Sequence, residues 1–217
     1  MADQLTTRQQ AYEQFLKDVA THEMTVLRND GVNRHIRFRR PNTNTCYFDL
    51  ITWSGHLCYT GDMGTFVFQR LEDMFEFFRT DRKYADKASC TLGINPGYWA
   101  EKLIAISTFV GHKEKSEDKF RAAIERQLDS WGANAELREE VQDEVYSELE
   151  NYGVDAAMIA AHKFRYEATS KMDRYFEFEM CEFSCDDYTF HMYWCFYALA
   201  WGILKFDEQF PPVQAAA

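Results

Sequence analysis

The sequence feature that most constrains the fold is a run of short alternating segments between His35 and Arg79. Apolar and polar residues alternate there, and Gly, Asn, Pro and Ser separate the segments. Ser54-Gly55 has the spacing of a two-residue β-hairpin turn. A second turn is expected at Gly61-Asp62-Met63-Gly64, before a strand over 65–69. The stretch therefore predicts an antiparallel meander against which helices pack.

The residues on either side of this meander predict several helices and a few further strands. A T-x-x-Q capping box at Thr7 to Gln10 favours an N-terminal helix. Apolar residues at helical spacing predict the other helices, over 71–78, 95–110, 116–131, 134–151, 154–170 and from Asp186 or Asp187 to 205. Period-two alternation predicts a first hairpin with strands 24–28 and 34–39, and a late strand over 174–183. This order predicts an α+β fold with an antiparallel sheet, as one domain over 1–217 with a disordered tail from 211.

Composition favours a compact protein with an aromatic core and an acidic surface. Hydrophobic residues make up 46% of the 217 residues and aromatic residues 16%, which exceeds what a disordered chain carries. The net charge of −11 argues against direct binding to nucleic acid or to an anionic membrane, because both require a cationic surface. The longest apolar run, 192–204, is shorter than the roughly 20 residues of a membrane span.

The cysteine and histidine residues do not follow a known catalytic or metal-binding pattern. The six cysteines form no C-x-x-C pair, which is typical of free thiols in a reducing cytoplasm. His56 and Cys58 share one side of a predicted strand and Cys46 is a third residue that could lie near them, but a zinc site requires four such ligands or three plus water. The chain has no P-loop, no G-x-G-x-x-G and no G-x-S-x-G. We therefore expect no cofactor, no metal and no assigned catalytic residue.

The charge pattern carries the strongest functional signal. Between residues 113 and 150 there are 12 acidic and 6 basic residues, a net charge of −6. On the helix predicted from Asn134, five acids lie off the apolar stripe and are expected to face solvent: Glu136, Glu139, Glu140, Asp143 and Glu144. Such a run is either an ordinary solvated helix face or a row of carboxylates that competes for a cationic groove. We take these five residues as candidates for partner binding.

Basic residues gather instead on the first predicted hairpin, and Arg37 and Arg39 are further candidates for partner binding. The other arginines of this group are Arg28, Arg34 and Arg40. The interpretation we favour is internal pairing with the acidic face of the late strand, Glu177, Glu179 and Glu182. Contact with an anion and self-association as a homodimer are the alternatives.

Four segments together resemble a family of bacteriophage and prophage accessory proteins with no assigned activity. They are HIRFRRP, YFDLITWSGHLCYTGDMGTFVFQRLEDMFEFFR, INPGYWAEKL and WCFYALAWGILKFD, and the similarity covers most of the chain from about residue 30. The resemblance implies a phage-encoded protein in the cytoplasm of the bacterial host. Small acidic phage accessory proteins are often inhibitors of host defence, such as CRISPR complexes or restriction enzymes. The resemblance therefore implies an anti-defence role by analogy with those proteins.

Three functional hypotheses follow. The first is a non-catalytic anti-defence inhibitor that mimics DNA and binds a host defence protein or nucleoprotein complex through the acidic helix. The second is a hydrolase or nucleotide-modifying enzyme that removes a defence signal, with a pocket where His56, Cys58 or Asp62 converge. The third is contact with nucleic acid through the strand that carries Arg34 to Arg40.

Overall fold

The computed structural model describes residues 6–85, 92–109, 111–167, 175–179 and 184–212. The chain divides into two compact units: a sheet unit, residues 1–112 with 188–217, and a helical insertion, residues 113–187. Each unit has a hydrophobic cluster of its own. The sequence alone predicts one α+β domain over 1–217, and it contains no linker signal that separates these units.

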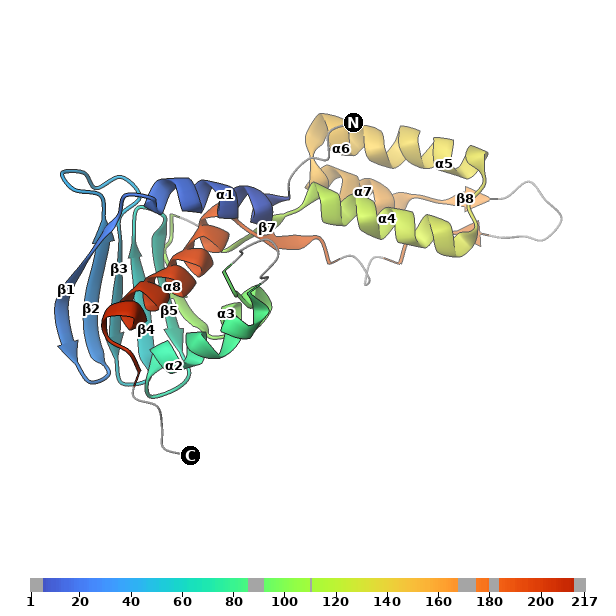
Figure 1. The fold of residues 1–217 in the computed structure, drawn as a ribbon. Helices are drawn as coiled ribbons and strands as arrows, with labels where there is room; N and C mark the ends of the chain where they lie inside the picture. The colour runs from blue at the N-terminus through green and yellow to red at the C-terminus, as the bar shows by residue number, and fades with distance from the viewer. Residues whose placement is uncertain (1–5, 86–91, 110, 168–174, 180–183, 213–217) are drawn as a thin grey trace. The chain divides into compact units, whose positions relative to one another are not determined.

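The sheet unit is built on six antiparallel strands that pair in sequence order (Figure 1). Both predicted turns of the meander are confirmed, because Trp53 lies opposite His56 and Gly61 lies opposite Gly64. The predicted α+β fold with an antiparallel sheet is likewise confirmed. The strands are β1 (Glu23–Asp30), β2 (Asn33–Arg39), β3 (Phe48–Trp53), β4 (His56–Gly61), β5 (Gly64–Gln69) and β6 (Leu103–Ile106).

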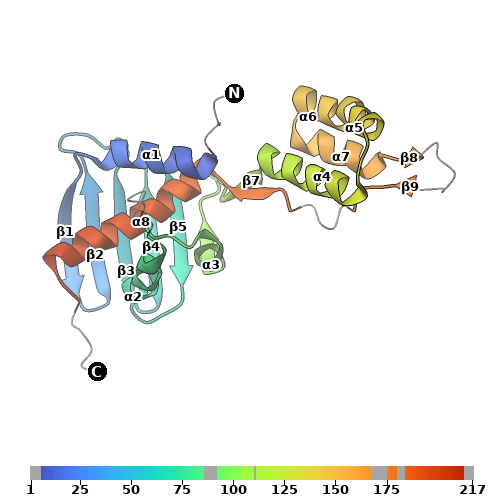
Figure 2. The same cartoon turned by 45° about the vertical axis from the view of Figure 1, so that its right-hand side comes forward.

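Four helices gather on one face of this sheet (Figures 1 and 2). They are α1 (Thr7–Val19), α2 (Met74–Arg79), α3 (Pro96–Ala100) and α8 (Phe190–Gln209), and a 3-10 turn, η1 (Thr80–Tyr84), follows α2. Helix α8 approaches the sheet closely at Gly202. A Cβ there would lie 2.9 Å from Leu50 Cδ1 and 3.1 Å from Phe38 Cε2. Aromatic rings from the sheet and from α8 fill the space between the two layers.

The predicted helix over 95–110 is wrong beyond its first turn. Asn95 caps α3, which ends at Ala100, and the chain then continues as the strand β6 on the edge of the sheet. The side chains of the expected helical stripe therefore separate: Trp99 is fully buried, whereas Phe109 is 96% exposed. Pairing of this segment with β5 overrides the helical spacing of its apolar residues.

Several predicted helix ends are displaced for local reasons. The capping box of α1 joins Thr6 and Gln9, one residue before the predicted pair. Helix α8 begins after Thr189, whose hydroxyl accepts a hydrogen bond from the Met192 N–H, instead of after Asp186 or Asp187. The helix predicted to reach about residue 170 ends at Lys163. Of the late strand, only Tyr175–Phe176 is a described strand, and 180–183 lie outside the described residues.

The helical insertion contains a run of helices joined to short strand pairs (Figure 2). Its helices are α4 (Glu117–Trp131), α5 (Ala135–Val141), the π-helical segment η2 (Gln142–Tyr146), α6 (Ser147–Tyr152) and α7 (Val154–Lys163). Two short sheets complete it: β7 (Lys113–Lys115) with β10 (Asp186–Tyr188), and β8 (Tyr166–Glu167) with β9 (Tyr175–Phe176). Predicted caps at Ser116 and Asn134 are confirmed.

The π-helical segment η2 has a cause in the sequence. The buried residues Leu137, Val141, Val145 and Leu149 recur every four positions. In a regular α-helix of 3.6 residues per turn, a four-residue repeat drifts by about 40° at each step. A π-helical turn takes up more residues per turn, so it returns the stripe to one face. The insertion thereby keeps one apolar face and one polar face over the length of α5, η2 and α6.

Among the described residues, no helix combines the length and the apolar character that crossing a bilayer would require.

Candidate partner-binding surface and a polar pocket

All five acidic residues singled out from the sequence lie exposed on the polar face of α5 and η2. They are Glu136, Glu139, Glu140, Asp143 and Glu144. Glu136 also lies beside β8: burial raises the pKa of the Tyr166 hydroxyl group, and the neighbouring Glu136 carboxylate raises it further. The predicted exposure of these side chains is thus confirmed, while their role in partner binding stays a prediction.

Most of these carboxylates have no basic partner in the described structure. The salt bridges in the described part of the insertion use other acids: Glu117, Glu125, Asp129, Glu150, Glu177, Asp186 and Asp187. Among described residues, Glu139, Glu140, Asp143 and Glu144 form no salt bridge. Their charge is therefore directed at solvent and available to a cationic partner.

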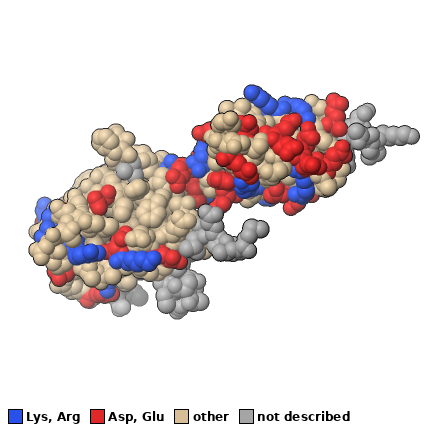
Figure 3. All heavy atoms as spheres, turned by 90° about the horizontal axis from the view of Figure 1, so that it is seen from above, with Lys and Arg blue, Asp and Glu red and all other residues tan. Residues whose placement is uncertain are grey.

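The negative charge of the protein is concentrated in the insertion. Residues 113–187 contain 20 acidic and 10 basic residues, a net charge of −10. The rest of the chain contains 15 acidic and 14 basic residues, a net charge of −1. Figure 3 shows the acidic side chains crowded over the surface of the insertion. This division of charge between the two units could not be predicted from the sequence, because the sequence does not reveal the bounds of the insertion.

A hollow of about 440 Å³ lies beside the acidic face, between η2 with α6 on one side and α7 on the other. Asp143, Glu144 and Glu148 line it together with Lys163, so carboxylates outnumber the single amine. Ile159 lines the same hollow and is 57% exposed. The hollow therefore combines an apolar surface with negative charge, which suits the aliphatic stem and the charged head of an arginine or lysine side chain.

Arg34 and Arg37 of the first hairpin pair within the sheet unit, but their predicted partners are wrong. Arg37 donates two hydrogen bonds of 2.8 Å to Asp49, and Arg34 donates two of 2.8 Å to Asp73. The expected partner Glu177 pairs instead with Arg165 inside the insertion, and Glu182 lies outside the described residues. Arg37 pairs within the sheet unit, and not with the late strand, because Asp49 lies directly opposite it on the neighbouring strand.

Of the two arginines proposed for partner binding, only Arg39 keeps an unneutralised charge. Arg39 is exposed and forms no salt bridge with a described residue. Arg37 is engaged with Asp49, which also lies 2.8 Å from Nε2 of His35. Burial alone would raise the pKa of Asp49, but hydrogen bonds from Arg37 and His35 outweigh it and the pKa is lowered.

The residues proposed for an enzyme pocket do not converge. His56 begins β4 and Asp62 follows its end, so six residues of extended chain separate them by about 20 Å. The His56 ring stacks on Trp53 at 5.0 Å, and Asp62 accepts a hydrogen bond from the Cys46 N–H. Burial raises the pKa of the Cys58 thiol, which lowers its reactivity.

The described cysteines and histidines also form no metal cluster. Within the described ranges, no three His, Cys, Asp or Glu side chains are grouped to hold a metal ion. Four cysteines are free thiols (Cys46, Cys58, Cys185 and Cys195), and Cys90 and Cys181 lie outside the described residues.

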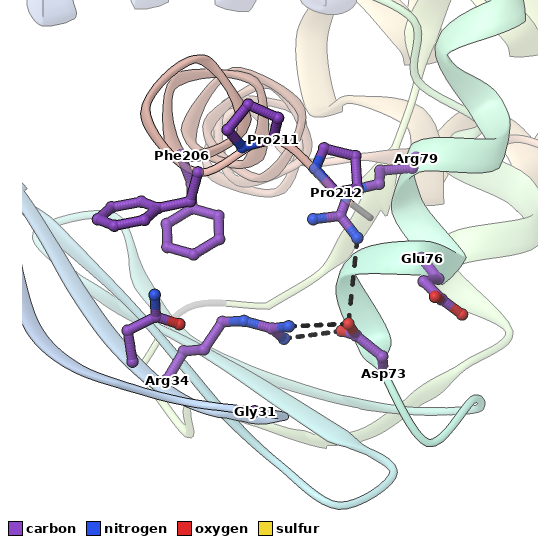
Figure 4. A pocket seen from close by; sticks show the side chains of 10 residues that line it. Gly31, Arg34, Asp73, Glu76, Arg79, Phe206, Pro211 and Pro212 are labelled. Carbon is purple, nitrogen blue, oxygen red and sulfur yellow. Dashed lines mark hydrogen bonds and ion pairs between the residues drawn. The ribbon is translucent and has the colours of Figure 1, made fainter. Parts of the chain in front are cut away.

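A second concave site, which the sequence did not indicate, lies in the sheet unit where β2, α2 and the end of α8 meet (Figure 4). This polar pocket has a volume of about 420 Å³. Its charged lining residues are Arg34, Asp73, Glu76 and Arg79, and the rings of Phe206, Phe210, Pro211 and Pro212 form its apolar wall.

The charged side chains of the polar pocket form an extended ion-pair network. Arg79 donates hydrogen bonds of 2.9 and 2.6 Å to Asp207, and Arg82 donates a third of 2.6 Å. Nη1 of Arg79 is 4.0 Å from Asp73, which already accepts from Arg34. Burial alone would raise the pKa of Asp73, but the hydrogen bond from Arg34 and the backbone N–H of Phe75 outweigh it and the pKa is lowered. Asp73 is thus held as a carboxylate.

The fold and the charge layout define an α+β protein with a nearly neutral sheet unit and a strongly acidic helical insertion. Comparison with protein-family models, with curated proteins and with solved structures finds no match for this chain. The functional argument therefore depends on the residues themselves.

Proposed function

We propose that this chain is a non-catalytic inhibitor that binds the nucleic-acid-binding surface of another protein through the acidic face of its helical insertion. The observation that carries the proposal is the concentration of charge: the insertion has a net charge of −10, against −1 for the rest of the chain. Proteins that bind DNA or RNA present arginine and lysine toward phosphates. A row of exposed carboxylates offers those same side chains an alternative partner.

The length of the acidic row supports this proposal. From Glu136 to Glu150, through α5, η2 and α6, the chain rises by about 21 Å at 1.5 Å per residue. Duplex DNA carries one negative charge per about 1.7 Å of axis, so about 21 Å of duplex is a little over half of a turn of about 34 Å and carries about 12 charges. The row spans this length with seven acidic residues. The cationic surface of the partner must therefore bind a row that has the length of this stretch of duplex DNA but fewer negative charges.

The hollow beside Asp143 and Glu144 offers a partner side chain packed contacts, which a row of exposed charges lacks. Electrostatic attraction between exposed charges raises association rates and is screened by salt, whereas packed contacts slow dissociation. In the proposed complex, an arginine or lysine of the partner packs its stem on Ile159 and places its charged group among the carboxylates. One such anchored side chain gives the complex a fixed register.

The biological setting we propose is phage inhibition of host defence. It comes from the resemblance to phage and prophage accessory proteins, and the acidic insertion is compatible with it. Defence nucleases and CRISPR complexes hold nucleic acid in cationic channels, which is the kind of surface an acidic row would occupy. The target in this proposal is a host defence protein or nucleoprotein complex, and the working compartment is the host cytoplasm.

A capture experiment with two charge-reversal variants tests the proposal. The face variant reverses Glu139, Glu140, Asp143 and Glu144 to Lys, and a control variant reverses four exposed acids of the sheet unit, Glu13, Glu23, Glu72 and Glu208. Both variants change the net charge from −11 to −3. Each tagged protein captures partners from bacterial lysate, with elution in rising salt and identification by mass spectrometry.

The two variants separate a specific face from overall charge. We expect the wild type and the control variant to retain the same nucleic-acid-binding protein and to release it as salt rises. The face variant should not retain it. Equal retention by the face variant and the wild type would contradict the proposal, and so would equal loss from both variants.

A further inference from the structure

The sheet has a second face, which no described helix of the sheet unit covers. The helices α1, α2, α3 and α8 gather on one face (Figures 1 and 2), and side chains there, such as Leu50, Tyr59 and Phe66, are fully buried. Successive side chains of a strand point to opposite faces, so the residues between these point to the other side. We call that side of β1 to β6 the open face.

An apolar row crosses the open face from β3 to β6. Ile51 lies opposite Cys58, Cys58 opposite Val67, and Val67 opposite Ala105. Cross-strand partners lie side by side on the same face, so these four side chains form one continuous row. Ala105 is exposed and the other three are half-buried, and Trp53, two residues after Ile51 on β3, is 39% exposed. Apolar surface therefore reaches solvent at the centre of the sheet unit's open face.

The centre of the open face also lacks free charge. On the described strands β3 to β6, Asp49 is its one acid or base apart from histidine, and this carboxylate is 4% exposed and paired with Arg37. Over β1 to β6 three bases balance three acids, a net charge of 0: Arg28, Arg37 and Arg39 against Glu23, Asp30 and Asp49. A solvated sheet face carries polar and charged side chains, so this uncharged centre favours a face that another surface covers.

The charge distribution indicates a second copy of the chain as that other surface. In a two-fold symmetric dimer the same patch of each copy meets itself, so a patch with net charge opposes like charge. The insertion, with a net charge of −10, would repel its own kind, whereas the open face would not. A neutral face also offers no electrostatic attraction to a charged partner such as nucleic acid.

The open face is large enough for a dimer interface. Six strands about 4.8 Å apart and about six residues long, at about 3.3 Å per residue, form a face of about 29 by 20 Å. Its projected area is about 580 Å², and the accessible area is larger because side chains make the surface uneven. A specific interface buries about 600–1,000 Å² on each partner.

We propose that the open face binds the open face of a second copy of this chain, so that the two sheets pack face to face. Packed sheets lie about 10 Å apart and their inner side chains interdigitate. The apolar row of each copy lies at the centre of the interface, and Glu23 and Arg39, on the outer strand pair, lie at its solvated rim. The contact belongs to the sheet unit and is independent of the proposed inhibition by the insertion.

The mass of the full chain in solution tests this interface. Analytical ultracentrifugation from nanomolar to high micromolar concentration should show the mass rising from one chain to two. Ile51→Glu places two glutamates in the apolar centre of each dimer and should weaken it by about 100-fold or more. Leu16→Glu is the matched control, because Leu16 is 42% exposed on α1 and the change in charge is the same. This control and the face variant of the insertion should dimerise like the wild type.

Methyl NMR of the wild type gives a second readout that does not depend on whether a variant folds. The methyl signals of Ile51 and Val67 should shift with protein concentration along the same curve as the mass. The methyl signals of Leu16, on the helix layer, should not shift. These signals locate the contact on the sheet instead of elsewhere on the chain.

Any of three results would overturn the proposal. The first is the mass of a single chain at every concentration. The second is a dimer that persists in folded Ile51→Glu or that Leu16→Glu weakens equally, because either result assigns the contact to another surface. The third is a dimer whose formation leaves the Ile51 and Val67 methyl signals unchanged.

Discussion

Replacement of Asp207 by Asn isolates the ion-pair network that holds α2 to α8. Asp207 is 8% exposed and accepts three hydrogen bonds from guanidinium groups. The amide of Asn offers one oxygen and turns donors toward the donors of Arg79. Asp207→Asn therefore leaves a half-buried guanidinium group without its main partner.

The size of the effect follows from the burial of each partner. Removal of one partner of a buried ion pair costs about 3–5 kcal/mol. Arg82 has a side chain that is 38% exposed and regains water, and Arg79 keeps Asp73 at 4.0 Å, so the lower end of that range applies. We expect a loss of about 3 kcal/mol in the free energy of unfolding of the sheet unit. At a urea dependence of about 2 kcal/mol per molar, the midpoint falls by about 1.5 M.

Urea unfolding followed by tryptophan fluorescence measures this shift. The Trp131→Phe background removes the tryptophan of the insertion, so the signal reports on the sheet unit alone. Asp30→Asn is the matched control, because Asp30 pairs with Arg28 at side-chain exposures of 76% and 60%. Such an exposed pair contributes about 0–1 kcal/mol. A midpoint shift in Asp207→Asn no larger than that of Asp30→Asn would refute the reasoning.

Two further perturbations of the sheet unit have expected outcomes. Gly202→Ala should lower the urea midpoint, because overpacking against Leu50 and Phe38 costs about 1–3 kcal/mol and outweighs a gain of about 1 kcal/mol in helix propensity. The control Gly97→Ala has open space around the added Cβ and should not lower the midpoint. Asp49 has a lowered pKa, so its contribution to stability is present above about pH 4 and is lost as the pH falls through its folded-state pKa. Asp49→Asn should therefore lower the midpoint at pH 7 and flatten its decline in acid, and a decline as steep as that of the wild type would contradict this assignment.

The meander was predictable because its turns carry local signals. The two residues Ser54-Gly55 fix the hairpin register, and the alternating pattern decides which side chains face the helices. The capped helices α4 and α5 were predictable for the same reason, since Ser116 and Asn134 satisfy free amides within three residues of the chain. Local chemistry specified these elements without help from distant residues.

The features that escaped prediction depend on long-range contacts. Strand β6 exists because β5 offers it an edge, and its own apolar spacing also suits a helix. The two separate cores, and with them the bounds of the insertion, arise from packing that no linker sequence announces. Asp207 and Arg79 are 128 residues apart, so neither their pairing nor the polar pocket could be read from spacing. The exposed acids of α5 were found because exposure follows directly from the apolar stripe.

A competition experiment tests the central claim most directly. A nucleic-acid-binding partner captured by the wild type is loaded with fluorescently labelled nucleic acid, and the anisotropy of the label is followed as the chain is added. We expect the wild type and the sheet-unit control variant to release the labelled nucleic acid, and the face variant to leave it bound. Release that is identical for the wild type and the face variant, or a stable complex that holds the chain and the nucleic acid together, would contradict binding of the acidic face to the nucleic-acid surface.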